Sequence, residues 1–112
     1  MTTKFEHGKV LIGNYTLNLH KYTYNDGARY EFVIKEEKQE TLLLERIEFL
    51  KPKINPKVDR HQSRSGDVIC KIAVSCNESD IPYFEYAFGP KFNYEFNSAE
   101  EFHLFPYRKA VN

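Results

Sequence analysis

Residues 22–30 read Tyr-Thr-Tyr-Asn-Asp-Gly-Ala-Arg-Tyr, a short polar break between two segments in which apolar and polar side chains alternate. Asp26 and Gly27 suit the two central positions of a type I′ turn, where both residues need a positive φ. Alternation with a period of two is typical of β-strands that bury one face. We therefore predict a long antiparallel β-hairpin over residues 15–34 that turns at Asp26 and Gly27.

The turn sets the register of the hairpin and hence the face on which each side chain lies. A two-residue turn at Asp26 and Gly27 places Leu19 opposite Ile34, and Tyr22 and Tyr24 then lie on the face away from the core. A three-residue loop with a bulge at Gly27 is the alternative, but it separates Leu19 from Ile34 and fits the apolar pattern less well. The predicted inward residues are Leu17, Leu19, Tyr30, Phe32 and Ile34.

The size and composition indicate one domain over residues 1–112, large enough to fold without metal or disulfide staples. Aromatic residues make up 15% of the chain, which favours strands because flat side chains pack well on a pleated sheet. The 16 basic and 16 acidic residues cancel, so the whole chain has no general attraction to nucleic acid or acidic membranes. Residues 1–7 lack the apolar core of a signal peptide, and no segment reaches the roughly 20 apolar residues of a membrane helix. We expect a cytoplasmic protein without a membrane partner.

Cys70 and Cys76 lie on one face of an alternating segment over residues 68–76. Along a strand they would be roughly 20 Å apart, whereas a disulfide needs Cα atoms within about 7 Å. We therefore predict two free thiols. No cysteine pair or histidine has metal-ligand spacing, so we expect no metal and no cofactor. The scattered histidines are His7, His20, His61 and His103.

Shorter segments extend the predicted sheet. Residues 9–12 form a strand that ends in a bulge or bend at Gly13 and Asn14, and residues 68–76 form another. Residues 83–88 and 91–96 alternate on either side of a Gly-Pro turn and are also predicted strands.

Residues 42–50 fit two patterns. Leu43, Ile47 and Leu50 have helical spacing, and most residues around them favour helix. However, no Ser, Thr, Asp or Asn precedes the segment as a cap, and no glycine closes it. We expect a strand here, with a helix as the alternative.

Ser98-Ala99-Glu100-Glu101 has the pattern of a capping box, which predicts a short helix from Ala99 to about Phe105 and a loose tail over residues 107–112. The predicted fold is therefore mainly β. We expect an antiparallel sandwich or partly open barrel of five to seven strands with one short C-terminal helix.

Residues 51–67 show no regular period and contain two prolines and a glycine, so we predict a long loop. Five cations against two acids give this segment a charge of +3, while the rest of the chain carries −3. Our hypothesis is that the loop binds phosphate, a nucleic-acid backbone or an acidic protein surface; an ordinary solvated loop is the alternative. The candidate binding residues are Lys57, Arg60, His61 and Arg64.

Tyr22 and Tyr24 add a second candidate surface beside Arg29 and Glu31 near the hairpin tip. Tyrosine next to arginine is typical of protein interfaces, and tyrosine also stacks on unpaired bases. Packing against a neighbouring strand or a helix is the structural alternative.

The sequence carries no catalytic motif, which leans against an enzyme. We expect a small interaction module or inhibitor that binds another macromolecule, most simply a protein, through the hairpin face and the basic loop. A nucleic-acid-binding domain that uses the same two features is the alternative. An edge strand also offers a route to a homodimer.

Overall fold

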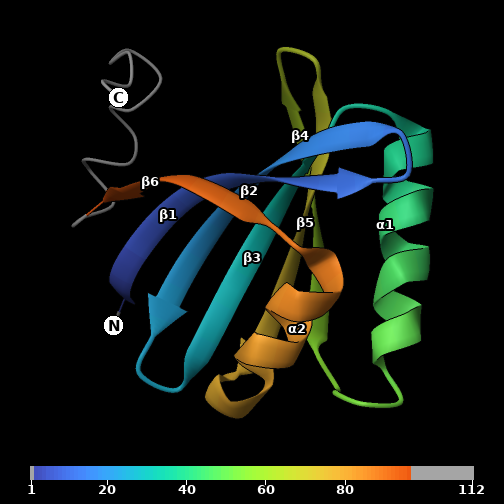
Figure 1. Ribbon diagram of the computed structural model, residues 1–112. Coiled ribbons are helices and arrows are strands. Elements are labelled where there is room, and N and C mark those ends of the chain that lie inside the picture. The colour runs from blue at the N-terminus through green and yellow to red at the C-terminus, as the bar shows by residue number, and fades with distance from the viewer. Residues whose placement is uncertain (1, 97–112) are drawn as a thin grey trace.

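The computed structural model describes residues 2–96, with side chains over residues 4–62 and 66–92 (Figure 1). All six strands belong to one antiparallel sheet in the order β4-β5-β3-β2-β1-β6. The strands are β1 (Thr2–Ile12), β2 (Tyr15–Tyr24), β3 (Gly27–Ile34), β4 (Lys57–Ser65), β5 (Val68–Asn77) and β6 (Lys91–Phe96). The helices are α1 (Glu37–Leu50), the short 3-10 turn η1 (Glu78–Asp80) and α2 (Ile81–Phe88).

The prediction of a mainly β, antiparallel domain with five to seven strands is confirmed. The strands form a single curved sheet, and the second layer of the described fold consists of α1 and α2 rather than a second sheet (Figure 1). The helix predicted over residues 99–105 and the tail over residues 107–112 lie outside the described residues. Neither helix within residues 2–96 combines the length and the apolar character needed to cross a membrane.

The core lies between the sheet and the two helices. The five hairpin side chains predicted to point inward are all at most 1% exposed. The ring of Phe84 on α2 stacks on Tyr30 with centroids 4.4 Å apart, and Phe88 packs on Phe32 at 5.6 Å. Aromatic pairs at these distances contribute beyond the area they bury, so they fix α2 on β3.

The β2–β3 turn lies one residue earlier than predicted, which shifts the pairing register by two residues. Tyr24 pairs with Gly27, so Asn25 and Asp26 are the central residues, and Leu19 lies opposite Phe32. Gly27 has no positive φ. It is a glycine for another reason: a Cβ there would lie 2.2 Å from the carbonyl oxygen of Cys76 on β5. Because a shift of two residues keeps every side chain on its face, the predicted faces are correct although the predicted turn is wrong.

Residues 42–50 belong to a helix, so the expectation of a strand is wrong. The start of α1 is capped without Ser, Thr, Asp or Asn, because Oε1 of the buried Gln39 accepts hydrogen bonds from the backbone N–H groups of Lys35 (2.9 Å) and Glu36 (3.3 Å). A side chain in the first turn that bonds back to the cap residue is half of a capping box. The buried stripe of the helix consists of Gln39, Leu43, Ile47 and Leu50.

Residues 83–88 are also helical rather than extended. Pro82 lies in the first turn of α2, where its missing N–H costs no hydrogen bond, and Gly89 ends the helix with a φ of 62°. Phe84 and Phe88, one turn apart, both point into the core. The alternation of aromatic residues in this segment therefore predicted a strand, whereas the residues that point inward are four apart, as in a helix.

The segment 51–67 is not a loop. A turn at residues 51–53 is followed by buried Ile54 and Pro56, and β4 then pairs with β5. β4 is an edge strand, and it turns polar side chains both to solvent and towards α1, so it lacks the apolar alternation of the central strands. On β5, Cys70 and Cys76 are free thiols on one face, as predicted.

Candidate functional site

One face of the sheet has no helix on it within residues 2–96, because α1 and α2 both pack on the other. We call it the open face. Strand register assigns its side chains, since residues directly opposite each other share a face. Four cations and two acids lie among them, which makes this face more positive than the neutral chain as a whole. Its central residues are Phe5, His7, Lys9, His20, Tyr22, Tyr24, Arg29, Glu31, Lys71, Ala73, Ser75, Lys57, Asp59 and His61.

A chain of polar contacts crosses the open face from β2 to β4. The hydroxyl of Tyr22 donates to Oε1 of Glu31 (3.2 Å), and Oε2 of the same carboxylate lies 3.0 Å from Nη2 of Arg29. Nη2 of Arg29 also lies 3.4 Å from Nε2 of His61. These contacts hold side chains of three strands in defined positions, so much of this surface is already organised.

Tyr22 is held through its ring and through its hydroxyl. Its ring forms a T-shaped pair with Phe5, with a centroid distance of 5.0 Å and an interplanar angle of 79°. Burial raises the pKa of Tyr22, and the neighbouring carboxylate of Glu31 raises it further. The hydroxyl is therefore a fixed, protonated donor.

His7 and His20 are a directly opposite pair on β1 and β2, with ring centroids 5.5 Å apart. Burial lowers the pKa of His7, and the positive charge of Lys9 lowers it further. The spacing of these histidines in the sequence predicted no contact between them. The two-residue turn at Gly13 and Asn14 brings them together, and treating that pair as a turn rather than a bulge or bend would have revealed the contact. No group of three or more metal-ligating side chains forms within residues 2–96.

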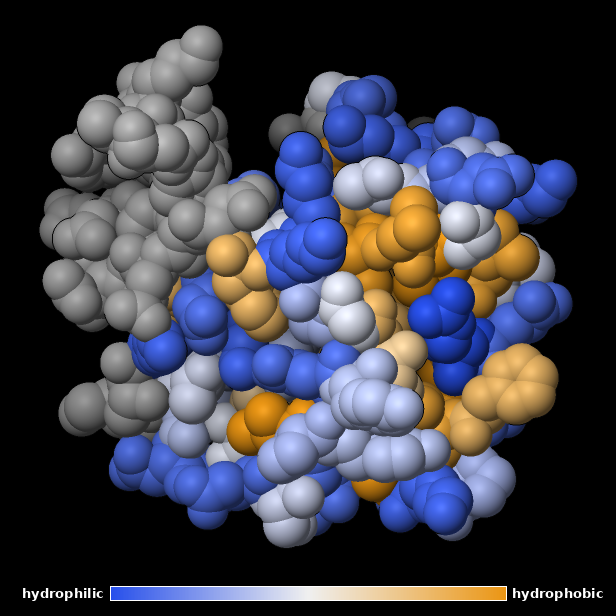
Figure 2. Space-filling model, viewed as in Figure 1, coloured by the Kyte–Doolittle hydropathy of each residue, from blue (hydrophilic) through white to orange (hydrophobic). Residues whose placement is uncertain are grey.

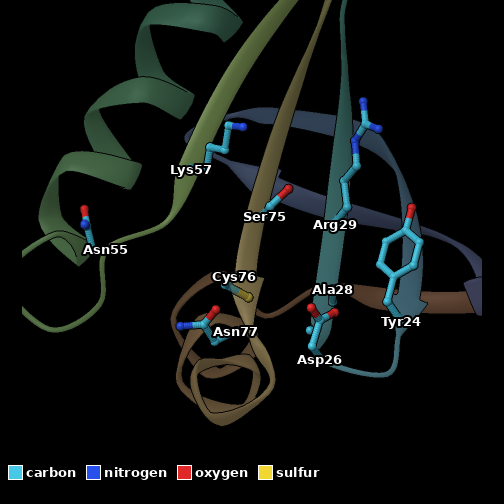
Figure 3. A pocket seen from close by; sticks show the side chains of 10 residues that line it. Tyr24, Asp26, Ala28, Arg29, Asn55, Lys57, Ser75, Cys76 and Asn77 are labelled. Atoms are coloured by element: carbon cyan, nitrogen blue, oxygen red, sulfur yellow. The ribbon is translucent and has the colours of Figure 1, made fainter. Parts of the chain in front are cut away.

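A pocket of about 320 Å³ lies where the open face meets the β2–β3 turn (Figure 3). Lys57, Ser75 and Arg29 come from β4, β5 and β3 and occupy one line across the sheet. A hydrogen bond from the N–H of Glu78 to the carbonyl of Asp26 (2.9 Å) fixes the turn against the end of β5. The other lining side chains shown in the close-up are Tyr24, Asp26, Ala28, Asn55, Cys76 and Asn77.

The sequence-predicted site residues divide between the two faces. Tyr22, Tyr24, Lys57 and His61 gather on the open face, although they come from two distant segments. Arg60 points to the helix side, where its guanidinium lies 2.6 Å from Glu40 of α1 and this hydrogen bond raises its pKa.

The structure thus places Arg60 in a contact with a helix rather than beside the other candidates. The backbone of Arg64 lies in β4, but its side chain lies outside the described part of the chain. Ser75 was missed because a serine in a strand carries no functional signal until the fold gives it neighbours.

A second polar cluster lies on the helix side, under α2. Lys21 forms ion pairs with Glu85 on α2 and, at 3.8 Å, with Glu6 on β1. Tyr30 donates a 2.6 Å hydrogen bond to Glu85, and burial followed by this bond raises the pKa of Tyr30. Burial and nearby carboxylates raise the pKa of Cys76 to about 11, so its thiol stays protonated. The groups satisfy one another, and we assign this cluster to stability.

The helix side also exposes apolar side chains. Phe49 is 80% exposed and Tyr86 is 86% exposed, and Figure 2 shows apolar residues gathered around α1 on the right of the view. Single exposed apolar residues are common on protein surfaces and do not by themselves mark an interface. Substitutions of these exposed residues serve as controls for substitutions on the open face.

Fold and site together define a two-layer domain in which helices cover one face of an antiparallel sheet and the other face carries a linked set of aromatic, cationic and imidazole side chains. The chain matches no protein-family model, no curated protein and no solved structure.

Proposed function

We propose that the protein is a small interaction module that binds a protein partner through the open face. The observation that supports this proposal is the convergence of Tyr22, Tyr24, Lys57 and His61, with Arg29 among them, on a face without a helix. Tyrosine and arginine dominate the binding energy of protein interfaces because they offer large contact areas at modest entropic cost. Polar contacts that already hold Tyr22, Arg29 and His61 reduce the ordering cost of binding.

A protein partner fits this surface better than nucleic acid does. Binding to unpaired bases needs aromatic rings with an accessible flat side, whereas Tyr22 is half-buried, packs against Phe5 and is bonded to Glu31. Binding to phosphates needs a strong excess of positive charge, whereas Glu31 and Asp59 offset two of the four cations on the open face. Nucleic-acid binding is the alternative that the experiment must separate.

Affinity capture with the intact chain from the cells that express it tests this function. Tyr24→Ser removes an aromatic ring from the open face, and Tyr86→Ser makes the same change on α2, where the ring is 86% exposed. Half of each sample is digested with nuclease before elution. We expect a protein partner that survives the nuclease, is lost with Tyr24→Ser and is retained with Tyr86→Ser. Recovery that depends on nucleic acid, or loss with Tyr86→Ser alone, would overturn the proposal.

A further inference from the structure

The register of three strands builds the pocket at the end of the open face. Lys57 lies directly opposite Ser75, and Ser75 lies directly opposite Arg29. Opposite residues have Cβ atoms about 5 Å apart, so the two long cationic side chains stand roughly 10 Å apart with a short serine between them. A pocket of about 320 Å³ is lined by these three side chains, and Figure 3 shows them on three neighbouring strands.

Each of these three side chains has a donor to offer a ligand. The ammonium group of Lys57 has no carboxylate within ion-pair distance among the described side chains, and the residue is exposed. The hydroxyl of Ser75 has no side-chain partner in the same part of the chain. Both contacts of Arg29 use Nη2, which leaves the hydrogens on Nε and Nη1.

The net charge of the side chains that line the pocket indicates which kind of ligand it can bind. Lys57 and Arg29 face one acid, Asp26, which leaves a single positive charge, and Glu31 lies 3.0 Å from Arg29 and offsets part of that. A residual charge of at most +1 is closer to the single negative charge of a carboxylate than to the nearly two negative charges of a phosphate monoester. Guanidinium and ammonium groups both bind carboxylates through short, charge-assisted hydrogen bonds.

We infer that this pocket binds the side-chain carboxylate of an acidic residue of the protein partner. Lys57, Ser75 and Arg29 donate to its oxygens, and Tyr24 at the rim contacts the adjoining chain. The inference rests on the proposed function, because it names the residue that the partner presents to the open face.

Backbone amide NMR with small probes tests the pocket without the partner. The probe is the blocked pentapeptide Gly-Gly-Glu-Gly-Gly, compared with the same peptide carrying glutamine or phosphoserine at its centre. We expect saturable shifts of the amides of Arg29 and Ser75 with the glutamate peptide alone. Lys57→Gln should weaken that binding about tenfold, whereas Lys38→Gln, which removes one exposed charge from α1, should leave it unchanged.

Three results would overturn the inference. Equal shifts with the glutamine peptide would mean that the carboxylate is not recognised, and unchanged binding by Lys57→Gln would mean that it binds elsewhere. Tighter binding of the phosphoserine peptide would assign the pocket to phosphate. If these tests fail while Tyr24→Ser still abolishes capture of a partner, the carboxylate assignment is wrong and the interaction module stands. If the peptide binds as expected but no protein is captured, the pocket is right and the proposed function is wrong.

Discussion

Nη2 of Arg29 on β3 lies 3.4 Å from Nε2 of His61 on β4, and this contact spans the width of β5. An arginine has no acceptor, so Nε2 must accept and the neutral imidazole must carry its proton on Nδ1. Ala73 lies on β5 between Ser75 and Lys71, the residues opposite Arg29 and His61, and is only 1% exposed although it belongs to the open face. The edge strand β4 is therefore joined to the centre of the open face by side chains as well as by the backbone ladder.

The tautomer of His61 provides the first prediction. When the imidazole of His61 is neutral, its ¹⁵N chemical shifts should show a protonated Nδ1 and an unprotonated Nε2. Arg29→Met removes the donor but keeps most of the side-chain length, so the tautomer should shift towards a protonated Nε2. A variant spectrum identical to that of the parent would contradict the contact between Arg29 and His61.

Gly27 should tolerate no side chain. A Cβ at this position would meet the carbonyl oxygen of Cys76 at 2.2 Å, and backbone atoms on two paired strands cannot move apart cheaply. We expect Gly27→Ala to lower the free energy of unfolding by about 2–3 kcal/mol, measured by urea denaturation.

Gly66→Ala is the control for this prediction. Gly66 has a φ of 65°, but nothing lies within 4 Å of its added Cβ. Its cost should be only the strain of a left-handed alanine, about 1 kcal/mol. Equal losses for the two variants would show that the close approach of β5 does not explain Gly27.

Sequence patterns predicted the inward hairpin residues because alternation survives an error of two residues in the pairing register. The turn itself was misplaced for a physical reason. Position 27 must be glycine because β5, a strand about fifty residues away in sequence, leaves no room for a side chain there. No local sequence pattern reveals such a neighbour. Likewise, the cap of α1 is made by Gln39, whose role becomes clear only when the side chain is seen to be buried.

The candidate site was predicted in part. Tyr22 and Tyr24 were assigned correctly to the face away from the core, because that follows from the hairpin alone. Lys57 and His61 were selected for charge within a supposed loop, and the alternation of β4 separates them from Arg60. Pairing of β4 with β5 is a long-range choice, so the meeting of these residues with the tyrosines could not be derived from the sequence.

Lys21 should stabilise the domain more than an exposed ion pair does. Its side chain is 12% exposed and lies between Glu6 and Glu85, which would both lose this cation in Lys21→Met. We expect a loss of about 2 kcal/mol by urea denaturation, because unpaired and partly buried carboxylates are costly. Lys51→Met breaks an exposed pair with Glu48 and should change the stability little. Similar effects of the two substitutions would contradict the structural role of the cluster under α2.

The stability should depend on pH through His7. Its pKa in the folded protein lies below the ordinary value of 6.5, so the unfolded chain takes up a proton at higher pH than the folded chain does. The contribution of neutral His7 to stability is therefore complete above pH 6.5 and is lost as the pH falls below that value. We expect the free energy of unfolding to fall less between about pH 7.5 and pH 5.5 in His7→Gln than in the parent. Parallel profiles for His7→Gln and the parent would contradict the assignment.

The central claim, that the open face binds a protein, is tested most directly by photo-crosslinking in cells that express the protein. The crosslinking amino acid p-benzoylphenylalanine replaces Tyr24 on the open face in one variant and Tyr86 on α2 in another. The open-face position should yield a discrete covalent adduct with another protein, and the α2 position should yield none although that side chain is 86% exposed. An adduct formed only from the α2 position would contradict the account, because the partner would then lie on the helix side.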